Sequence, residues 1–299
     1  MTRGNCVRRQ TGWNPGGRPA WYTEIRMRAS ETSVQVIDLF AGPGGLGEGF
    51  SAQVQNGLKF DVVLSVEKDA AAHRTLLLRT FFRQFEPGKA PDEYYQYLRG
   101  DLSIDSLIDA FPEEASAAAD RCLHLELSSQ SARRVYATIE RTLKPHEPWV
   151  LIGGPPCQAY SVVGRSRRAR VDRQEFEQDE RHTLYREYLR ILSRYRPAVF
   201  VMENVKGLLS ATLSGSSTFE RVKADLASPT AALRERSTGS LESRYKEYAV
   251  LSFVQGTSDS EALEPGDYVI EAEKFGIPQK RHRVILLGVR EDLCDGSGD

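Results

Sequence analysis

Short apolar runs recur along the chain, and each one ends at a cluster of glycine or polar residues. The runs cover residues 34–40, 60–66, 149–152, 198–202, 248–254 and 284–289. Each run is apolar almost throughout, which is typical of strands that are buried on both faces. The pattern therefore predicts a mostly parallel β-sheet.

Helical patterns lie between these runs, at residues 70–82 and 183–195. In the second, five apolar residues share one helix face, and Pro197 follows its end. Alternation of strands and helices predicts an α/β fold with helices on both faces of the sheet. Residues 102–148 are expected to be helical, and residues 210–247 to form helix and surface loop.

Polar clusters coincide with the ends of the predicted strands. They comprise residues 38–49, Glu67, residues 153–158 and the pair Glu203 and Asn204. Ligands of open α/β sheets bind at the carboxyl ends of the strands. We therefore expect these four clusters to share one site, within a single domain over residues 33–299 that follows a mobile tail at residues 1–32.

The composition excludes several classes of protein. A formal net charge of -1 gives no overall basic excess, so any surface for nucleic acid must be local. No run approaches the roughly 18 apolar residues of a membrane helix, and the N-terminus lacks a secretory signal. The four cysteines are far apart and have no zinc-like spacing, which argues against a metal site or a disulfide framework and favours a reducing cytoplasm.

A glycine-rich loop follows the first predicted strand. Gly42, Gly44 and Gly47 satisfy the spacing G-x-G-x-x-G, and Glu67 lies 20 residues further on. Taken alone, this pattern fits a dinucleotide as well as another nucleoside cofactor. The acidic Asp38 just before the loop favours a ligand that carries an ammonium group over a pyrophosphate.

Three further segments carry candidate chemistry. Two prolines precede Cys157 and fix the backbone around its thiol, which favours a nucleophile over an inert core cysteine. Glu203 ends a buried strand, where a carboxylate is either paired or functional. Arg281 and Arg283 alternate, so they should share one strand face while His282 points the other way.

Together, and in this order, these segments resemble the DNA cytosine-5 methyltransferase family of bacterial restriction-modification systems, over residues 36–290. The resemblance implies the Rossmann-like fold of methyltransferases that use S-adenosyl-L-methionine. It also implies that the cofactor binds to Asp38, Leu39, Phe40, Ala41, Gly42, Gly44, Gly45, Leu46, Glu67, Lys68, Asp101, Leu102 and Pro156.

The resemblance further implies how catalysis would work. Cys157 would add to carbon 6 of a cytosine flipped out of duplex DNA, while Glu203 stabilises the adduct at ring nitrogen 3. Arg281 would contact the base carbonyl or the thiol environment, and Arg283 would support Glu203. The DNA is expected to contact a mobile loop through Gln158, Ser161, Gly164, Arg165, Arg167 and Arg168.

Family members continue past the last motif with a target-recognition region and a final segment, and neither has a counterpart here. We therefore expect double-stranded DNA, a second subunit that supplies the missing parts and a cognate restriction endonuclease as partners, with weak or no activity for the chain alone. Methylation of tRNA cytosine, a non-catalytic subunit and, more distantly, a nicotinamide oxidoreductase remain alternatives.

Overall fold

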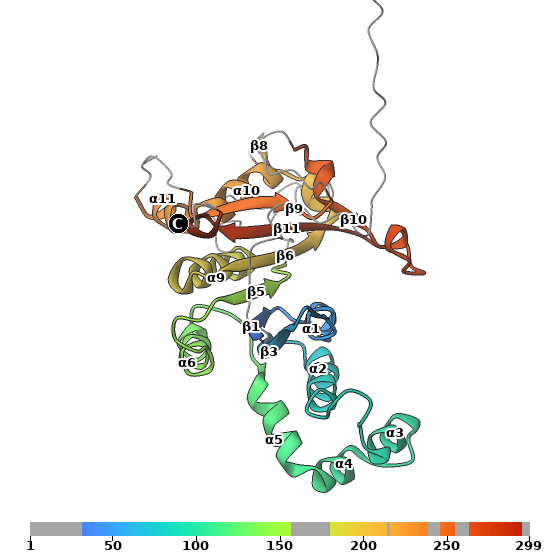
Figure 1. The fold of residues 1–299 in the computed structure, drawn as a ribbon. Helices are drawn as coiled ribbons and strands as arrows, with labels where there is room; N and C mark the ends of the chain where they lie inside the picture. Colours follow the sequence, from blue (N-terminus) through green and yellow to red (C-terminus); the bar gives the residue numbers. More distant parts are fainter. Residues whose placement is uncertain (1–31, 157–179, 214–215, 239–245, 255–262, 295–299) are drawn as a thin grey trace, which may run out of the picture.

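A computed structural model describes residues 32–156, 180–213, 216–238, 246–254 and 263–294 (Figure 1). A nine-stranded sheet runs through this part of the chain, in the order β10-β11-β6-β5-β1-β3-β2, with β4 beside β3 and β9 beside β11. A separate hairpin consists of β7 (Thr212–Leu213) and β8 (Ser216–Ser217).

The centre of the sheet is parallel. Its strands are β1 (Thr32–Leu39), β3 (Leu58–Glu67), β4 (Cys122–His124), β5 (Trp149–Gly153) and β6 (Val199–Val205). All five have their carboxyl ends at one edge. The five strands contain four of the six apolar runs that predicted a parallel sheet.

The outer strands make the sheet mixed. The antiparallel members are β2 (Val54–Gln55), β9 (Tyr248–Ser252), β10 (Val269–Glu271) and β11 (His282–Arg290). Because β11 runs against β6, the first residues of β11 lie beside the last residues of β6. A mostly parallel sheet is thus correct for the centre only, and the antiparallel β11 brings the last sequence motif to the edge where the other motifs end.

Helices cover both faces of the sheet, as the alternation predicted (Figure 1). The α-helices are α1 (Gly45–Ser51), α2 (Ala70–Phe82), α3 (Asp92–Arg99), α4 (Ile104–Ala110), α5 (Pro112–Arg121), α6 (Ala132–Thr142), α9 (Glu180–Tyr195), α10 (Thr218–Ala227) and α11 (Pro229–Thr238). Short 3-10 helices are η3 (Lys206–Leu209), η4 (Pro265–Tyr268), η5 (Ala272–Phe275) and η6 (Glu291–Leu293). None of the helices in the described ranges is long and apolar enough to cross a membrane.

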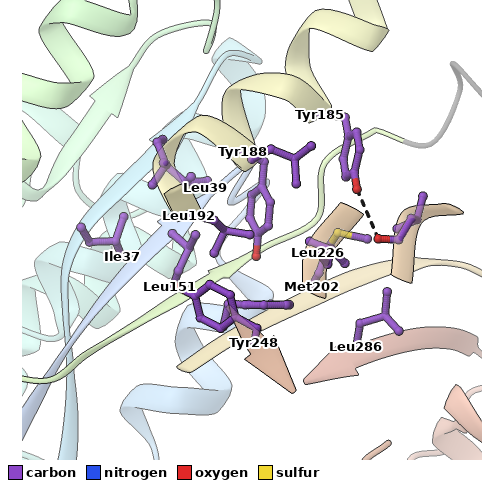
Figure 2. Close-up of a cluster of buried hydrophobic side chains, with 14 of the residues drawn as sticks. Ile37, Leu39, Leu151, Tyr185, Tyr188, Leu192, Met202, Leu226, Tyr248 and Leu286 are labelled. Carbon is purple, nitrogen blue, oxygen red and sulfur yellow. Dashed lines mark hydrogen bonds between the residues drawn. The ribbon is translucent and has the colours of Figure 1, made fainter. Parts of the chain in front are cut away.

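Alternate residues of the central strands build two apolar layers. Ile37 and Leu151 face the layer that α9 covers, where they pack with Tyr188 and Leu192 (Figure 2). Their neighbours, such as Val36, face the opposite layer beneath α1. Complete burial of such a side chain contributes about 1.5–3 kcal/mol, so both layers hold the central strands in place.

The predicted helical stretch at residues 102–148 contains a strand as well. It includes α4, α5 and α6, but Cys122–His124 form β4, which extends the sheet beyond β3. The helical prediction was therefore wrong for these three residues. The segment is too short to show a period of its own, and its partner β3 stabilises it through tertiary pairing.

A close contact at Gly288 offers a test of this packing. Gly288 lies opposite Phe200 on β6, and a β-carbon built on the glycine would overlap the Phe200 ring. We expect Gly288→Ala to lower the free energy of unfolding by roughly 1–3 kcal/mol, because the buried ring must shift. Urea unfolding followed by circular dichroism measures the loss.

The matched control is Gly49→Ala on α1, where a β-carbon would meet nothing within 4 Å. Alanine replaces an exposed helical glycine there, so stability should stay equal or rise by up to about 1 kcal/mol. Equal losses in the two variants would contradict the proposed packing at Gly288.

Candidate active site

A pocket lies at the carboxyl edge of the parallel strands. It is partly open to solvent, and a concave and mostly apolar surface with a few polar groups is typical of small-ligand sites. Its walls come from the ends of β1, β3 and β5, from α9 and from the segment after β4. The lining residues are Phe40, Val66, Glu67, Lys68, Leu125, Leu127, Gly154, Pro156 and Leu184.

Glu67 joins the glycine loop to the start of α2. Its Oε2 accepts a hydrogen bond from the backbone N–H of Gly42 at 2.7 Å, and its Oε1 accepts one from the N–H of Asp69 at 2.7 Å. A carboxylate has about four lone-pair positions, so both oxygens keep acceptor capacity toward the pocket. Glu67 can therefore accept further hydrogen bonds from a ligand in the pocket.

Phe40 has an unusual backbone at the pocket wall. Its φ is 57°, in the left-handed region that a bulky residue rarely adopts. Such a conformation costs about 1–3 kcal/mol and is found mainly at functional sites. The strained backbone places an aromatic ring in the pocket lining, where it can contact a flat nucleobase or another apolar group.

Most of the remaining glycine-loop residues support the pocket from behind. Leu39 is completely buried in the core layer of α9, and Ala41 is buried against Leu76. Leu46 belongs to α1 and packs against the opposite layer. Gly44 has a φ of 88° and precedes α1, while Gly45 is its first residue. The loop thus shapes the edge, and Phe40 is its member in the pocket lining.

Asp38, which was predicted to contact the cofactor, does not line the pocket. Its side chain is fully buried on the α1 side of the sheet, with Oδ2 at 3.1 Å from a β-carbon built on Gly47. Neither carboxyl oxygen has a well-formed hydrogen bond. Burial raises the pKa of Asp38 to about 7, against the lowering effects of Arg83 and of the Gly47 N–H. Successive residues of a strand face opposite sides of the sheet. Leu39, and not Asp38, faces the layer that contains the pocket.

Asp101 and Leu102 are not brought to the pocket either. Asp101 lies in the connection between α3 and α4, where its exposed carboxylate pairs with Arg99 Nε at 3.1 Å. Leu102 packs in a separate cluster with Leu107 and Phe81. Both residues were predicted through the resemblance, but the segment before them is helix α3 and not a strand of the sheet.

The predicted catalytic carboxylate and arginines do come together. Glu203 Oε1 lies 2.7 Å from Arg283 Nε and 3.8 Å from Arg281 Nη2. The antiparallel register pairs Ile285 with Glu203, which places the start of β11 next to the carboxylate. The Glu203 side chain remains 24% exposed, so a ligand can reach it.

The alternation predicted for these arginines is also found. His282 pairs with Glu273 Oε1 at 2.7 Å, whereas the residues on either side of it both approach Glu203. Arg283 has the supporting position that was predicted for it. Arg281, half exposed at the longer distance, is free to contact a ligand in addition to Glu203.

Asn204 was expected near the site, as part of the polar cluster with Glu203, but without a task of its own. Its buried Nδ2 donates a hydrogen bond to the carbonyl of Pro155 at 3.1 Å, and its Oδ1 accepts one from the Val205 N–H at 2.8 Å. A β-carbon built on Gly154 would lie 3.1 Å from Glu203 Oε2. Asn204 thus ties the segment that leads to residue 157 against the Glu203 end of β6. The signal in the sequence for this task was the amide residue that directly follows the carboxylate at the end of the strand.

Cys157 itself and the six residues predicted to contact DNA lie outside the described residues. Two cysteines lie among the described residues: Cys122 is buried and Cys294 is exposed. Neither of them lines the pocket. Burial raises the pKa of the Cys122 thiol, which donates a hydrogen bond to Thr80 Oγ1 at 3.2 Å. Cys122 therefore has the properties of a structural cysteine.

The amino-acid sequence that forms this site is similar to the sequences of known proteins. Residues 125–228 match the family model described as C-5 cytosine-specific DNA methylase. The type II methyltransferase M.Bpa9945I of Bacillus paralicheniformis is 31% identical over 275 residues, which cover 86% of this chain and 54% of that protein. The DNA (cytosine-5-)-methyltransferase M.ApeKI of Aeropyrum pernix is 32% identical over 151 residues, which cover 49% of this chain and 28% of that protein.

A solved structure from E. coli, described as a prophage-encoded DNA modification methyltransferase, superposes with a TM-score of 0.45 and 20% identity. It covers 87% of this chain, and the chain covers 48% of it. The chain likewise spans about half the length of the first of its curated relatives. The family model covers the segment from the pocket wall through Glu203 and Asn204, and the longer match extends over most of the chain. Over residues 125–228 the chain matches the C-5 cytosine-specific DNA methylase family, and over most of its length it is similar to a type II methyltransferase.

Proposed function

We propose that the chain transfers a methyl group from S-adenosyl-L-methionine to carbon 5 of a cytosine in duplex DNA, as part of a restriction-modification system. The observation that carries the proposal is the arrangement around Glu203. Two arginines hold this carboxyl group beside the segment that leads to Cys157, and that segment also lines the pocket at the carboxyl edge of the sheet. These are the groups that covalent activation of a cytosine requires.

Each group has a definite task in the proposed reaction. The Cys157 thiolate adds to carbon 6 of the base and forms a carbon–sulfur bond. Glu203 donates a proton or a hydrogen bond at ring nitrogen 3, so the ring electrons become available at carbon 5. Arg283 holds Glu203 in place, and Arg281 contacts the base carbonyl. Once carbon 5 carries the methyl group, loss of its proton to solvent breaks the carbon–sulfur bond and releases the thiolate and the methylated base.

The residues present fit the cofactor. Glu67 offers acceptors for ribose hydroxyls, and Phe40, Leu125 and Pro156 supply apolar surface. When bound, S-adenosyl-L-methionine supplies an electrophilic methyl group. Cytosine in a base stack is inaccessible to Cys157, so the target base must leave the duplex. The arginines between residues 165 and 173 would contact phosphates, and a second subunit would supply target recognition.

Trapping on DNA that contains 5-fluorocytosine tests the proposal. Fluorine cannot be removed as the carbon 5 proton is, so the covalent adduct persists after methyl transfer. We expect an adduct between the chain and DNA that survives denaturing electrophoresis and forms only when S-adenosyl-L-methionine is present. Cys157→Ser should abolish it.

Cys122→Ser is the matched control, because Cys122 is buried away from the pocket. This variant should form the adduct as the unmodified chain does. If the unmodified chain forms no adduct, even when a subunit with target recognition is supplied, the catalytic proposal fails and a non-catalytic role is the better interpretation.

A further inference from the structure

An apolar groove lies between helices α2, α3, α4 and α5, apart from the pocket at the carboxyl edge of the sheet. Its lining includes Leu77, Phe81, Tyr97, Ile104 and Ile108. Ile104 and Ile108 are 41% and 40% exposed, although both are large and apolar. Apolar side chains that remain exposed together in a hollow commonly mark a surface that another molecule or chain segment covers.

The helices around the groove carry a surplus of acidic residues. Residues 92–121, which form α3, α4 and α5, include eight acidic and two basic residues, a net charge of -6. The two basic residues are already paired, Arg99 with Asp101 and Arg121 with Asp61. Since α3 and α4 extend away from the sheet (Figure 1), much of this charge faces solvent.

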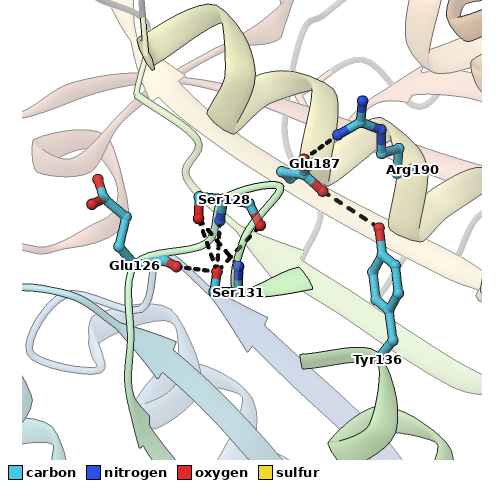
Figure 3. Close-up of polar contacts among 6 residues, drawn as sticks. All are labelled: Glu126, Ser128, Ser131, Tyr136, Glu187 and Arg190. Atoms are coloured by element: carbon cyan, nitrogen blue, oxygen red, sulfur yellow. Dashed lines mark hydrogen bonds and ion pairs between the residues drawn. The ribbon is translucent and has the colours of Figure 1, made fainter. Parts of the chain in front are cut away.

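Charge is balanced differently on the face of the sheet that α6 and α9 cover. There Glu187 of α9 pairs with Arg190 one turn further along, and it accepts a hydrogen bond from the Tyr136 hydroxyl of α6 at 3.4 Å (Figure 3). This carboxylate is completely buried, and its partners belong to the same layer of the fold. The acidic surplus of α3, α4 and α5 is exposed instead, where it attracts a basic partner.

Helix α4 combines the apolar and the acidic positions. Ile104 and Ile108 are four residues apart, so they lie on one helix face and both line the groove. Asp105 and Asp109 follow them directly and are exposed, so an acidic edge runs beside the apolar groove. A partner that fits both must carry apolar side chains and positive charge, and the acidic edge repels the phosphates of DNA.

The first 31 residues of this chain have that combination. Residues 1–31 contain six arginines and two glutamates, a net charge of +4, and they include Trp13, Trp21 and Tyr22. Over residues 25–28, two apolar residues alternate with two arginines. In an extended conformation, such a segment presents apolar side chains on one side and arginines on the other.

The groove is within reach of this segment. Thr32 pairs with the first residue of β3, and three residues further along β3 Asp61 pairs with Arg121 Nη1 at 2.6 Å. Arg121 ends α5, and Ala118 of the groove lining lies one turn before it. These steps together span at most about 30 Å, whereas the eleven residues from Trp21 to Thr32 can span about 36 Å.

We infer that the groove between α2 and α5 is a docking site for residues 1–31 of the same chain. The aromatic side chains of the segment occupy the apolar groove, and its arginines lie along the acidic edge of α4. Arg74, which also lines the groove, can stack on an indole ring. The inference goes beyond the proposed function and does not depend on it.

Photo-cross-linking in the full chain tests the inference. A benzoylphenylalanine residue in place of Trp21 reacts with neighbouring C–H bonds on illumination, and mass spectrometry of the digested protein identifies the partner. We expect most cross-links to join residue 21 to the groove lining within the same chain. Denaturing electrophoresis separates links within one chain from links between two chains.

Reversal of the acidic edge provides the first variant. Asp105→Lys combined with Asp109→Lys should lower the yield of groove cross-links about threefold or more, because favourable charge contacts become unfavourable. Both residues are exposed, so the fold should be retained. The matched control, Glu147→Lys combined with Glu220→Lys, makes the same change in charge on exposed residues outside the groove lining and should leave the yield unchanged.

The second variant removes apolar contact without a change in charge. Ile104→Asn combined with Ile108→Asn should also lower the yield of groove cross-links about threefold or more, because the segment loses its apolar surface. Leu293→Asn is the control, since Leu293 is 50% exposed in η6 and lies outside the groove lining. Circular dichroism shows whether each variant is folded.

The outcomes decide between the possible partners of the segment. Cross-links scattered over other surfaces, or a yield that is the same in variants and controls, would overturn the inference. Links between two chains would replace it by docking onto a second copy, and links to added duplex DNA would assign the arginines to phosphates. None of these results bears on the proposed methyl transfer, which is tested through Cys157.

Discussion

Replacing Glu203 with glutamine is expected to slow the modification of cytosine by roughly 10²- to 10⁴-fold, the usual contribution of a positioned acid or base. Glutamine keeps the shape of glutamate and can still donate a hydrogen bond, but it cannot transfer a proton to ring nitrogen 3. Without that proton, electrons pushed into the ring by the thiolate remain on nitrogen as an unfavourable negative charge. Addition at carbon 6 should therefore become slow.

Exchange of tritium from carbon 5 of labelled cytosine in DNA measures this step directly. Exchange requires the covalent adduct but no methyl transfer, so it separates base activation from cofactor binding. Glu203→Gln should bind S-adenosyl-L-homocysteine as the unmodified chain does, because Glu203 does not line the pocket. The prediction would be contradicted by an exchange rate within about threefold of the unmodified chain.

The matched control is Glu140→Gln. Glu140 also pairs with an arginine, Arg194, at 3.0 Å, but this pair lies on the surface between α6 and α9. Its removal should leave exchange unchanged and alter stability by less than about 1 kcal/mol. A large effect in Glu203→Gln alone would then reflect the position of Glu203 and not the loss of an ion pair as such.

Much of the fold could be predicted because its signals are local. The helix at residues 70–82 has the predicted bounds, since Asp69 caps it by accepting hydrogen bonds from the N–H groups of Ala71 and Ala72. The apolar runs located six strands because continuous burial requires such runs. The segments around Glu67 and Glu203 were expected at one edge because both end a strand, whereas Arg283 was expected beside Glu203 through the resemblance.

The rest depended on information that is not local. An apolar run has no direction, so the antiparallel course of β11 could not be predicted from its residues. The three residues of β4 gain their structure from β3, and their absence from the prediction left Asp101 as the apparent neighbour of Glu67. Likewise, the sequence shows that Asp38 and Leu39 face opposite ways, but not which of the two layers holds the pocket.

Replacing Asp38 is expected to have the second large effect, in this case on the stability of the folded chain. Its pKa in the folded chain is raised by burial to about 7, from an ordinary value of 3.8. Between these two values the folded chain binds a proton that the unfolded chain releases. The stabilising contribution of protonated Asp38 is therefore complete below pH 4 and is lost as the pH rises through 7. A shift of this size corresponds to roughly 4 kcal/mol.

We accordingly expect Asp38→Asn to be more stable than the unmodified chain at pH 8, with a difference that shrinks as the pH falls toward 5. Asparagine has nearly the same shape and has no charge to bury. Urea unfolding at several pH values measures the difference. Asp61→Asn is the control: Asp61 is a half-exposed partner of Arg121, and its replacement should change stability by less than about 1 kcal/mol.

The same variant distinguishes two roles for Asp38. If Asp38 contacted the ammonium group of the cofactor, as the sequence suggested, Asp38→Asn would weaken binding of S-adenosyl-L-homocysteine by 10-fold or more, since a hydrogen bond to a charged group contributes about 1.5–3 kcal/mol. The buried position on the α1 side of the sheet predicts instead that binding changes by less than about threefold while stability rises. A large loss of binding would show that the Asp38 carboxylate turns toward the pocket when the cofactor binds, and that its burial costs stability in return for affinity.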